Sequence, residues 1–151
     1  MIKKVLTGPE FKRAFLDLEE IFREENGKYG HALFSIDHQS VIDNFAHTNV
    51  LNNLFHCWVN WEDGKADGII IFSDIHQPFL NQRMWYEQFW VSKNPKKSFA
   101  LYREAVKFAK KRDIPYIVMN CVENYPTSPK LKKIYEKLGF KKDSESYIKK
   151  L

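Results

Sequence analysis

The sequence MWYEQFWVSKNPKKS, at residues 84–98, decides how the rest of the chain is interpreted. Apolar and aromatic side chains dominate its first eight positions, which predicts a buried strand over residues 84–91. A long helical pattern, FALYREAVKFAKKR, follows directly at residues 99–112. A strand, a short basic loop and an amphipathic helix therefore form the unit around which we place the other elements.

The basic loop is the first candidate site. Lys93, Lys96 and Lys97 surround Pro95, and the helix is expected to begin at Lys97 or Ser98. Main-chain N–H groups at a helix start, together with the helix dipole, favour an anion. The loop could therefore hold a phosphate group, although an ordinary strand–helix connection with solvated lysines explains it equally well.

Length and composition indicate one folded domain over residues 1–151. A hydrophobic content of 44% and an aromatic content of 15% are too high for a disordered chain. The net charge of +5 suits a polyanionic small molecule or a nucleic acid. Because the lysines are spread over several segments without a basic tail, a nucleic-acid partner rests on charge alone and is disfavoured.

Cysteines and hydropathy set further limits. Cys57 and Cys121 are too few for a disulfide framework or a zinc ribbon, and both lie in expected strands, which favours reduced, packed thiols. The sequence shows no signal-peptide pattern and no apolar run long enough to span a bilayer. We therefore expect a cytoplasmic protein that does not use a membrane.

Periodicity and turn signals predict the element order β-α-α-β-β-β-α-β-α-β. Around the central unit, strands are expected at 2–6, 54–61, 66–75, 116–122 and 146–151, and helices at 7–26, 40–49 and 128–138. Asp63-Gly64 is a hairpin signal, and Gly139 is expected to end the last helix. This order predicts an α+β fold with a mixed, mostly antiparallel sheet and helices on both faces.

The order and two motifs resemble the GNAT family of N-acetyltransferases, similar to its phage and bacterial members. The stronger motif is SPKLKKIYEKLGF at residues 128–140, compared with Asn-Pro-x-Ala-x-x-Leu-Tyr-Glu-Lys-x-Gly-Phe in the family. Tyr135, Gly139 and Phe140 fall in register, and Ser128 stands where the family usually has asparagine. The resemblance covers the chain from about Met84 to its end.

The second motif is degenerate. The family's pyrophosphate loop reads Gln/Arg-x-x-Gly-x-Gly/Ala, and Lys93, Lys96 and Ser98 occupy those three positions. In another register the motif starts at Lys96. Either way the glycines that let a backbone approach a phosphate are missing, and Pro95 has no N–H to donate. The lysines would have to compensate by charge.

The resemblance implies acetyl-CoA as co-substrate and assigns its binding residues. The pantetheine would pair with the main chain of Phe89, Trp90 and Val91. The pyrophosphate would lie on residues 93–99. Asn120 could bond the pantetheine or the substrate, although a structural asparagine is the simpler interpretation. The complete set of implied cofactor residues is Phe89, Trp90, Val91, Lys93, Lys96, Lys97, Ser98, Phe99, Asn120 and Ser128.

Two residues are candidates for proton transfer in the direct attack of an amine on the thioester. Glu87 stands in an aromatic strand, where a carboxylate is costly unless it is paired or lines a wet cleft, and the resemblance makes it the base. The resemblance makes Tyr135 the acid at the sulfur of CoA. A structural, hydrogen-bonded Glu87 and a core Tyr135 are the alternatives. His76 is an alternative base, although a surface histidine is the simpler interpretation.

No metal site is expected, because the remaining histidines lack metal-ligand spacing; they are His31, His38, His47 and His56. The acceptor is left open among a small amine, a peptide N-terminus, a lysine and a modified nucleotide, and so is a homodimer. Two other classes of function compete with the enzyme. One is a catalytically silent GNAT fold that binds a partner protein, and the other is a basic nucleic-acid-binding domain.

Overall fold

The computed structural model describes residues 1–29, 37–47, 50–121, 128–144 and 149, and its five strands form one mixed sheet in sequence order. Strands β1 to β4 are antiparallel neighbours, whereas β5 runs parallel to β4. The bounds are β1 Ile2–Val5, β2 Phe55–Glu62, β3 Lys65–Gln77, β4 Gln82–Ser92 and β5 Tyr116–Val118. The predicted α+β class with a mostly antiparallel sheet is confirmed.

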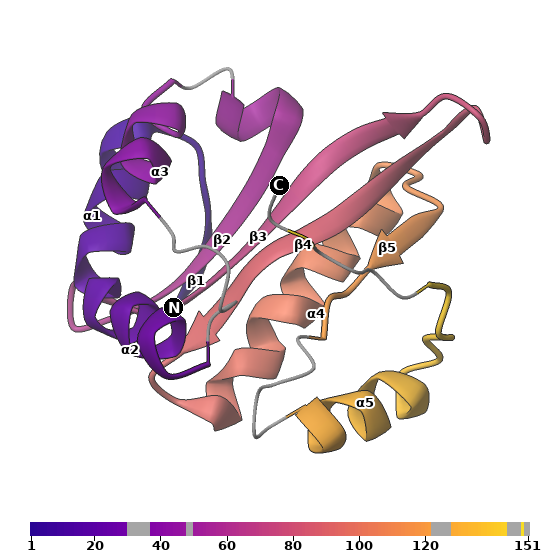
Figure 1. Cartoon of the computed structure of the whole chain (residues 1–151). Helices are drawn as coiled ribbons and strands as arrows, with labels where there is room; N and C mark the ends of the chain where they lie inside the picture. Colours follow the sequence, from indigo (N-terminus) through magenta and orange to yellow (C-terminus); the bar gives the residue numbers. More distant parts are fainter. Residues whose placement is uncertain (30–36, 48–49, 122–127, 145–148, 150–151) are drawn as a thin grey trace.

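Helices cover both faces of this sheet (Figure 1). Helices α1 to α3 lie on one face and α4 on the other, and α5 joins α4 through ring contacts of Phe140 with Tyr102 and Tyr135. No helix in the described part of the chain is both long and apolar enough to cross a membrane. The bounds are α1 Gly8–Asp17, α2 Glu19–Tyr29, α3 His38–Asn44, a π-helical turn η1 Val50–Leu54, α4 Pro95–Lys111 and α5 Ser128–Lys137.

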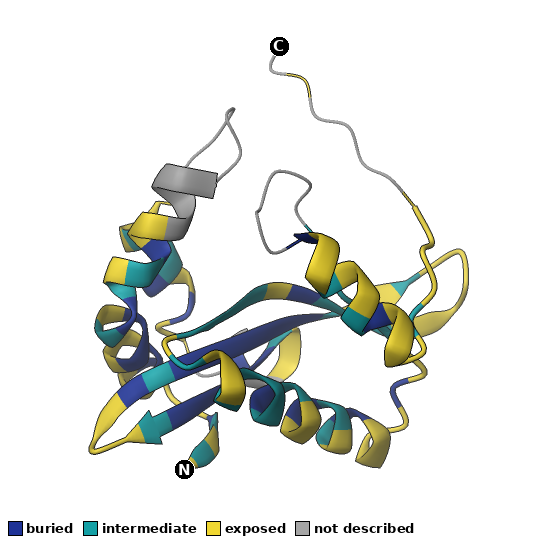
Figure 2. Cartoon of the chain, turned by 90° about the horizontal axis from the view of Figure 1, so that it is seen from below, coloured by how far each residue is buried: buried dark blue, intermediate teal, exposed yellow. Residues whose placement is uncertain are grey.

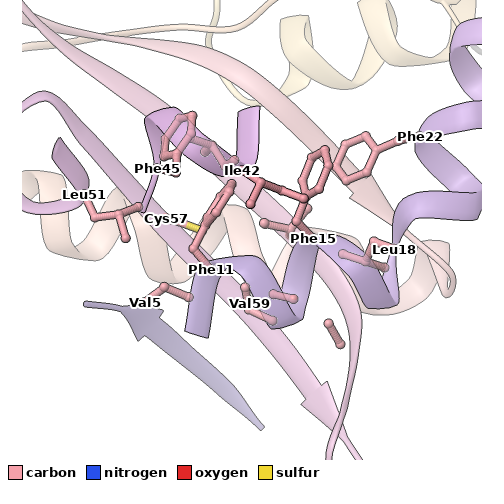
Figure 3. Packing of buried hydrophobic residues seen from close by; sticks show 14 residues of the cluster. Val5, Phe11, Phe15, Leu18, Phe22, Ile42, Phe45, Leu51, Cys57 and Val59 are labelled. Carbon is pink, nitrogen blue, oxygen red and sulfur yellow. The ribbon is translucent and has the colours of Figure 1, made fainter. Parts of the chain in front are cut away.

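The sheet separates two hydrophobic clusters. The first lies under α1 to α3, where Phe11 stacks on Phe15 and Phe45 (Figure 3). The second lies under α4 and contains Trp58, Ile70, Phe72 and Trp85. Because side chains alternate along a strand, Ile69 and Ile71 enter the first cluster while Ile70 and Phe72 enter the second. Figure 2 accordingly shows β3 buried along its centre, as its apolar run predicted.

The first predicted helix is wrong in one respect: it is two helices with a break at Leu18. There the Asp17 carboxylate accepts the N–H of Ala66 at 2.8 Å, and the Asp17 carbonyl accepts Lys93 Nζ at 2.9 Å. These long-range bonds, with the complete burial of Leu18, override a helical periodicity that continues unbroken. The second helix then runs past Asn26-Gly27 to Tyr29.

The predicted helix over 40–49 begins earlier than expected. The Asp37 side chain accepts the N–H of Ser40 at 2.9 Å, so α3 starts at His38 and ends at Asn44. The π-helical turn η1 then occupies the position where the next strand was expected to start. That strand, β2, therefore begins at Phe55.

Two bounds near the site also differ from the prediction. Helix α4 begins at Pro95, because the Asn94 side chain caps it. Strand β5 ends at Val118, four residues short of the predicted end, because β4 and β5 separate there. The predicted strand at 146–151 lies outside the described residues, apart from residue 149.

Glycines mark three close turns or contacts. Asp63 and Gly64 both have positive φ in the β2–β3 hairpin, and Gly139 has φ +88° after α5, as predicted. At Gly8 a Cβ would collide with the main chain of Ala46. The start of α1 therefore packs directly on the chain after α3, and only glycine fits there.

Candidate active site

A gap opens between β4 and β5 at Glu87. The two strands pair only at Met84, Trp85 and Tyr86, opposite Tyr116, Ile117 and Val118. In the described residues β5 forms no ladder with β4 beyond that point. Among the described residues, no strand therefore pairs on this side with the main chain of β4 after Tyr86.

A β-bulge at Gln88 changes the direction of the side chains along β4. Phe72 pairs with Glu87 and Ile71 with Phe89, which leaves Gln88 without a cross-strand partner. The Gln88 side-chain amide donates instead to Ser73 Oγ at 3.0 Å. Glu87 shares the α4 face of the sheet with Trp85 and Phe72, and the extra residue turns Phe89 to the opposite cluster.

Glu87 is buried, with 9% of its surface exposed, and is hydrogen-bonded to Asn120. The N–H of Asn120 donates to Glu87 Oε2 at 2.9 Å, and the Asn120 side-chain amide donates to the Glu87 carbonyl. Burial disfavours the charged carboxylate and raises its pKa to about 7, while the bond from the Asn120 N–H acts in the opposite direction. The carboxyl group therefore changes charge near neutral pH.

Tyr135 belongs to the same group. Its hydroxyl donates to the carbonyl of Asn120 at 3.2 Å, and its ring contacts Phe140 with a centroid distance of 5.5 Å. Burial raises the pKa of the phenol, and the neighbouring Glu87 charge raises it further. Glu87, Asn120 and Tyr135, three residues predicted from the sequence, are thus brought together by three hydrogen bonds.

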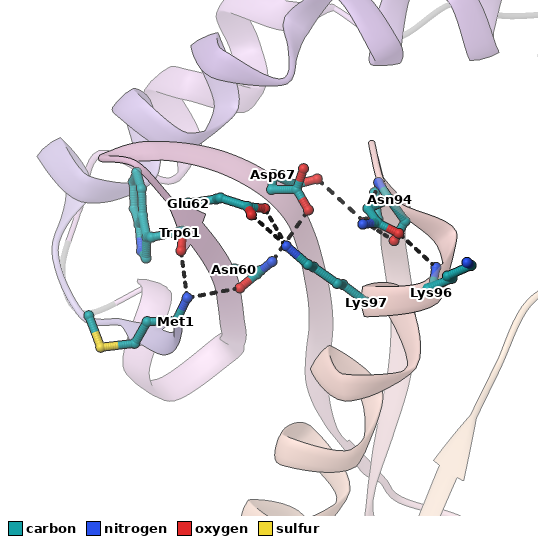
Figure 4. A network of polar contacts seen from close by, with 9 residues as sticks. Met1, Asn60, Trp61, Glu62, Asp67, Asn94, Lys96 and Lys97 are labelled. Carbon is teal, nitrogen blue, oxygen red and sulfur yellow. Dashed lines mark hydrogen bonds and ion pairs between the residues drawn. The ribbon is translucent and has the colours of Figure 1, made fainter.

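The start of α4 carries its own hydrogen-bond acceptor (Figure 4). Asn94 Oδ1 accepts the N–H of Lys96 at 3.1 Å, and the Asn94 carbonyl accepts the N–H of Lys97 at 3.0 Å. Pro95 has no N–H to offer. The helix start therefore lies earlier than predicted, and two of its N–H groups already have acceptors within the chain.

Two of the three loop lysines also have partners. Lys93 donates to the carbonyl of Asp17, and Lys97 forms an exposed ion pair with Glu62 at 2.6 Å (Figure 4). This pair lowers the pKa of Glu62 and raises that of Lys97. Lys96 is exposed and has no side-chain partner among the described residues.

The residues on either side of the loop hold it to the sheet. Trp90 donates its indole N–H to the carbonyl of Ser98 at 3.3 Å, and its ring meets Phe99 edge-on at 5.3 Å. Val91 pairs with Ile69 of β3. The Trp90 side chain therefore fastens β4 to α4 below the loop, through the Ser98 carbonyl and the Phe99 ring.

Ser128 and the cysteines complete the predicted set. Ser128 is 2% exposed, is the first residue of α5, and accepts the Cys121 thiol through its carbonyl at 3.7 Å. Cys57 is buried in the first cluster, where burial raises the pKa of its thiol. Both cysteines are free thiols, but Cys121 lies after the end of β5 and is half-buried, so the expectation of a packed thiol inside a strand is wrong for Cys121.

His76 does not join this site. It is exposed near the end of β3, with its ring 3.2 Å from Asn81 Oδ1, and pairs across the strands with Arg83, four residues before Glu87. The described residues contain no group of three side chains suited to a metal ion. His31 lies outside the described residues.

Sequence reasoning missed a buried histidine–aspartate pair. His56 and Asp74, each with 3% of its side chain exposed, contact at 3.0 Å, and Arg83 also donates to Asp74. Burial lowers the pKa of His56, although Asp74 acts in the other direction. The alternation of side chains along β2 and β3 could have suggested that both residues lie on one face of the sheet. Their contact depends on the strand register, in which His56 pairs with Phe72, two residues before Asp74.

Comparison with solved structures places this fold among acetyltransferases. Over 100% of this chain and 99% of the other, it matches a ribosomal-protein-alanine N-acetyltransferase from Brucella melitensis biovar Abortus 2308, with a TM-score of 0.71 and 16% identity. An aminoglycoside acetyltransferase from an uncultured soil metagenomic sample, in complex with sisomicin, gives a TM-score of 0.72 at 12% identity over 100% and 96%. A predicted acetyltransferase with acetyl-CoA from Clostridium acetobutylicum gives 0.66 at 19% over 100% and 95%.

No family model and no curated protein matches the sequence. The likeness to the solved structures therefore rests on the arrangement of the backbone. It shows that the chain has the fold of the GNAT acetyltransferases, which confirms at the level of the fold the resemblance found in the two sequence motifs.

Proposed function

We propose that the protein is an N-acetyltransferase that moves the acetyl group of acetyl-CoA directly to a primary amine. The observation that carries this proposal is the β4–β5 gap, where Glu87, Asn120 and Tyr135 form one hydrogen-bonded group. The shared fold of three acetyltransferases supports it.

The proposed reaction forms a C–N bond and breaks a C–S bond. The amine nitrogen attacks the thioester carbonyl, and the nitrogen loses a proton to Glu87, directly or through one water. The tetrahedral intermediate then expels the thiolate of CoA. Glu87 returns its proton to solvent, and the products are the acetylated amine and CoA.

Glu87 suits the role of base because of its burial. A general base works best when its pKa lies near the operating pH. The pKa of about 7 keeps a large fraction of Glu87 charged at neutral pH while making it a better proton acceptor than an ordinary glutamate.

Tyr135 acts at the sulfur. Its raised pKa keeps the phenol protonated, whereas a thiol ordinarily has a pKa of ~8.5. The hydroxyl therefore stabilises the leaving thiolate mainly by donating a hydrogen bond. Because a hydroxyl has one hydrogen, this bond replaces the one to the Asn120 carbonyl.

The cofactor is proposed to lie along β4. Its pantetheine would pair with the open main chain of Phe89, Trp90 and Val91, and its pyrophosphate would approach residues 93–99. Lys96 is positioned to meet a phosphate without giving up a partner, whereas Lys97 would first have to leave Glu62.

The acceptor is proposed to be a primary amine on a small molecule or a peptide. Two of the structural neighbours represent these classes, since their names give an aminoglycoside and a ribosomal-protein alanine as acceptors. Release of free CoA, followed with a thiol reagent, would be measured with sisomicin and with an alanine-terminated peptide.

Tyr135→Phe tests the mechanism in the same assay. We expect kcat to fall by about 10-fold or more, as for the loss of a donor to developing charge, while CoA binds within about twofold of wild type. Tyr116→Phe, at a half-exposed position of β5, is the matched control and should behave as wild type. Equal rates for wild type and Tyr135→Phe would remove Tyr135 from the mechanism.

A catalytically silent fold that binds a partner protein is the second candidate. The capped start of α4 and the Lys97–Glu62 pair favour it, because both use donors that a pyrophosphate would need. It predicts no binding of acetyl-CoA and no CoA release with any amine.

A further inference from the structure

Asn120 uses three of its polar groups at the gap. Its N–H and its side-chain amide donate to the carboxylate and the carbonyl of Glu87, and its own carbonyl accepts the Tyr135 hydroxyl. No other described residue contacts both proposed proton-transfer groups through hydrogen bonds. Asn120 is nevertheless exposed, so the side of the gap on which it lies is open to solvent.

The two bonds to Glu87 differ from those of a parallel ladder. In a ladder, main-chain N–H groups of one strand donate to main-chain carbonyls of the next, which holds the strands ~4.8 Å apart. Here each bond runs through a side chain, the carboxylate of Glu87 in one and the amide of Asn120 in the other. Direct pairing ends at Tyr86 and Val118, immediately before this connection.

We propose, on the basis of the proposed function, that Asn120 is a positioning residue whose two bonds to Glu87 keep β4 and β5 a side chain apart and hold the carboxylate at the gap. We call these two bonds the Glu87–Asn120 bracket. Direct ladder pairing at this point would cover the β4 main chain that the cofactor is proposed to use. Without the bracket, the buried carboxylate would also lose its N–H partner, which is costly.

The groups around the bracket determine how it is measured. Tyr135 faces Glu87 from α5, and Cys121 and Tyr102 lie around Tyr135. No lysine or arginine among the described residues perturbs Glu87. A Glu87→Gln variant removes only the titration of the carboxylate, since a glutamine oxygen can still accept the Asn120 N–H.

The test is the pH dependence of the residue-120 main-chain amide signal in nitrogen-15 NMR spectra of the free protein. In wild type we expect the signal to shift with a midpoint near pH 7 as its carboxylate acceptor ionises. The shift should be absent in Glu87→Gln. Asn120→Ala and Asn120→Asp both remove the side-chain donor and should lose at least half of its amplitude. Asn53→Ala, at an exposed position of η1, is the control and should titrate as wild type.

Two results would overturn the proposal. One is an amide at 120 that does not titrate in wild type, and the other is a full shift in both Asn120 variants. Calorimetry with CoA separates this outcome from that of the proposed function. If the NMR signature is present but CoA does not bind, the Glu87–Asn120 bracket is supported and the proposed function is contradicted. If CoA binds but the signature is absent, the proposed function is supported and the bracket is contradicted. If both hold, Asn120→Ala should weaken CoA about 10-fold and Glu87→Gln by no more than about twofold; equal binding by Asn120→Ala would also contradict the role of the bracket in the gap.

Discussion

The basic loop at residues 93–98 and the β4–β5 gap are the two halves of the proposed cofactor site, and they satisfy their polar groups in opposite ways. In the loop, Asn94 caps the helix and Glu62 pairs with Lys97 at the exposed surface. In the gap, a buried carboxylate and a buried phenol are bonded to one asparagine. Lysine count therefore indicates charge, whereas buried polar groups with shifted pKa values are the candidates for chemistry.

The largest expected effect belongs to the gap. Glu87→Gln removes the proposed base and should lower kcat by about 100-fold or more. In wild type the rate should rise with pH through about 7, because the base acts only when it has lost its proton. A pH–rate profile of both proteins checks this. A profile unchanged by Glu87→Gln would remove Glu87 from the role of base and leave it to water.

The same substitution should stabilise the fold at high pH. The pKa of Glu87 is about 7 in the folded state and ordinarily 4.5, so between these values the folded state binds more protons than the unfolded state. Stability is therefore lost as pH rises from 4.5 through 7. Glu87→Gln avoids this loss and should be about 3 kcal/mol more stable than wild type at pH 8.

Urea unfolding at pH 4.5 and at pH 8 measures that difference. The two proteins should have nearly equal stability at the lower pH, where the carboxyl group is protonated in the folded state and about half protonated in the unfolded state. If the difference in stability between the two proteins is the same at both pH values, burial does not raise the pKa of Glu87 in the folded state.

Substitutions in the basic loop should have a smaller effect than the substitution in the gap. Lys96→Ala combined with Lys97→Ala should weaken CoA about fivefold at low salt and less at high salt, because exposed charges are screened. Lys107→Ala combined with Lys110→Ala, further along the exposed side of α4, is the matched control in calorimetry. Equal affinity in the loop variant and wild type would place the phosphates elsewhere.

The smallest expected effect is an increase in the affinity for CoA. Glu62→Gln frees Lys97 from its ion pair, and we expect CoA to bind about twofold more tightly at low salt, with the gain lost at high salt. Calorimetry at two salt concentrations would detect it. Weaker binding by Glu62→Gln would show that the pair supports the loop and does not compete with the ligand.

Periodicity and turn chemistry were sufficient to predict the sheet and most helices. The apolar run at 69–72, the Asp63-Gly64 turn and Gly139 each behave as their local chemistry dictates. The break at Leu18 could not be predicted in this way, because it depends on partners from β3 and the loop after β4. The start of α4 could have been: Asn94-Pro95 is a cap followed by a favoured first-turn residue.

At the site, the sequence predicted which residues take part but not how they contact one another. Glu87 was named as a carboxylate among aromatic residues and Tyr135 as part of a family motif, whereas Asn120 was named only as a residue that the resemblance implied. Their mutual bonds depend on where β4 and β5 separate, which the sequence does not indicate. Lys93 and Lys97 were expected to face a phosphate, but each has a partner from a distant segment of the chain, which the sequence does not indicate.

A titration of the nitrogen-15-labelled protein with CoA decides whether the cofactor binds along β4. We expect saturation in the micromolar range, with the largest main-chain amide shifts at Phe89, Trp90, Val91 and Asn120. No shift at millimolar CoA, or shifts confined to the exposed lysines of α4, would contradict a cofactor bound in the β4–β5 gap.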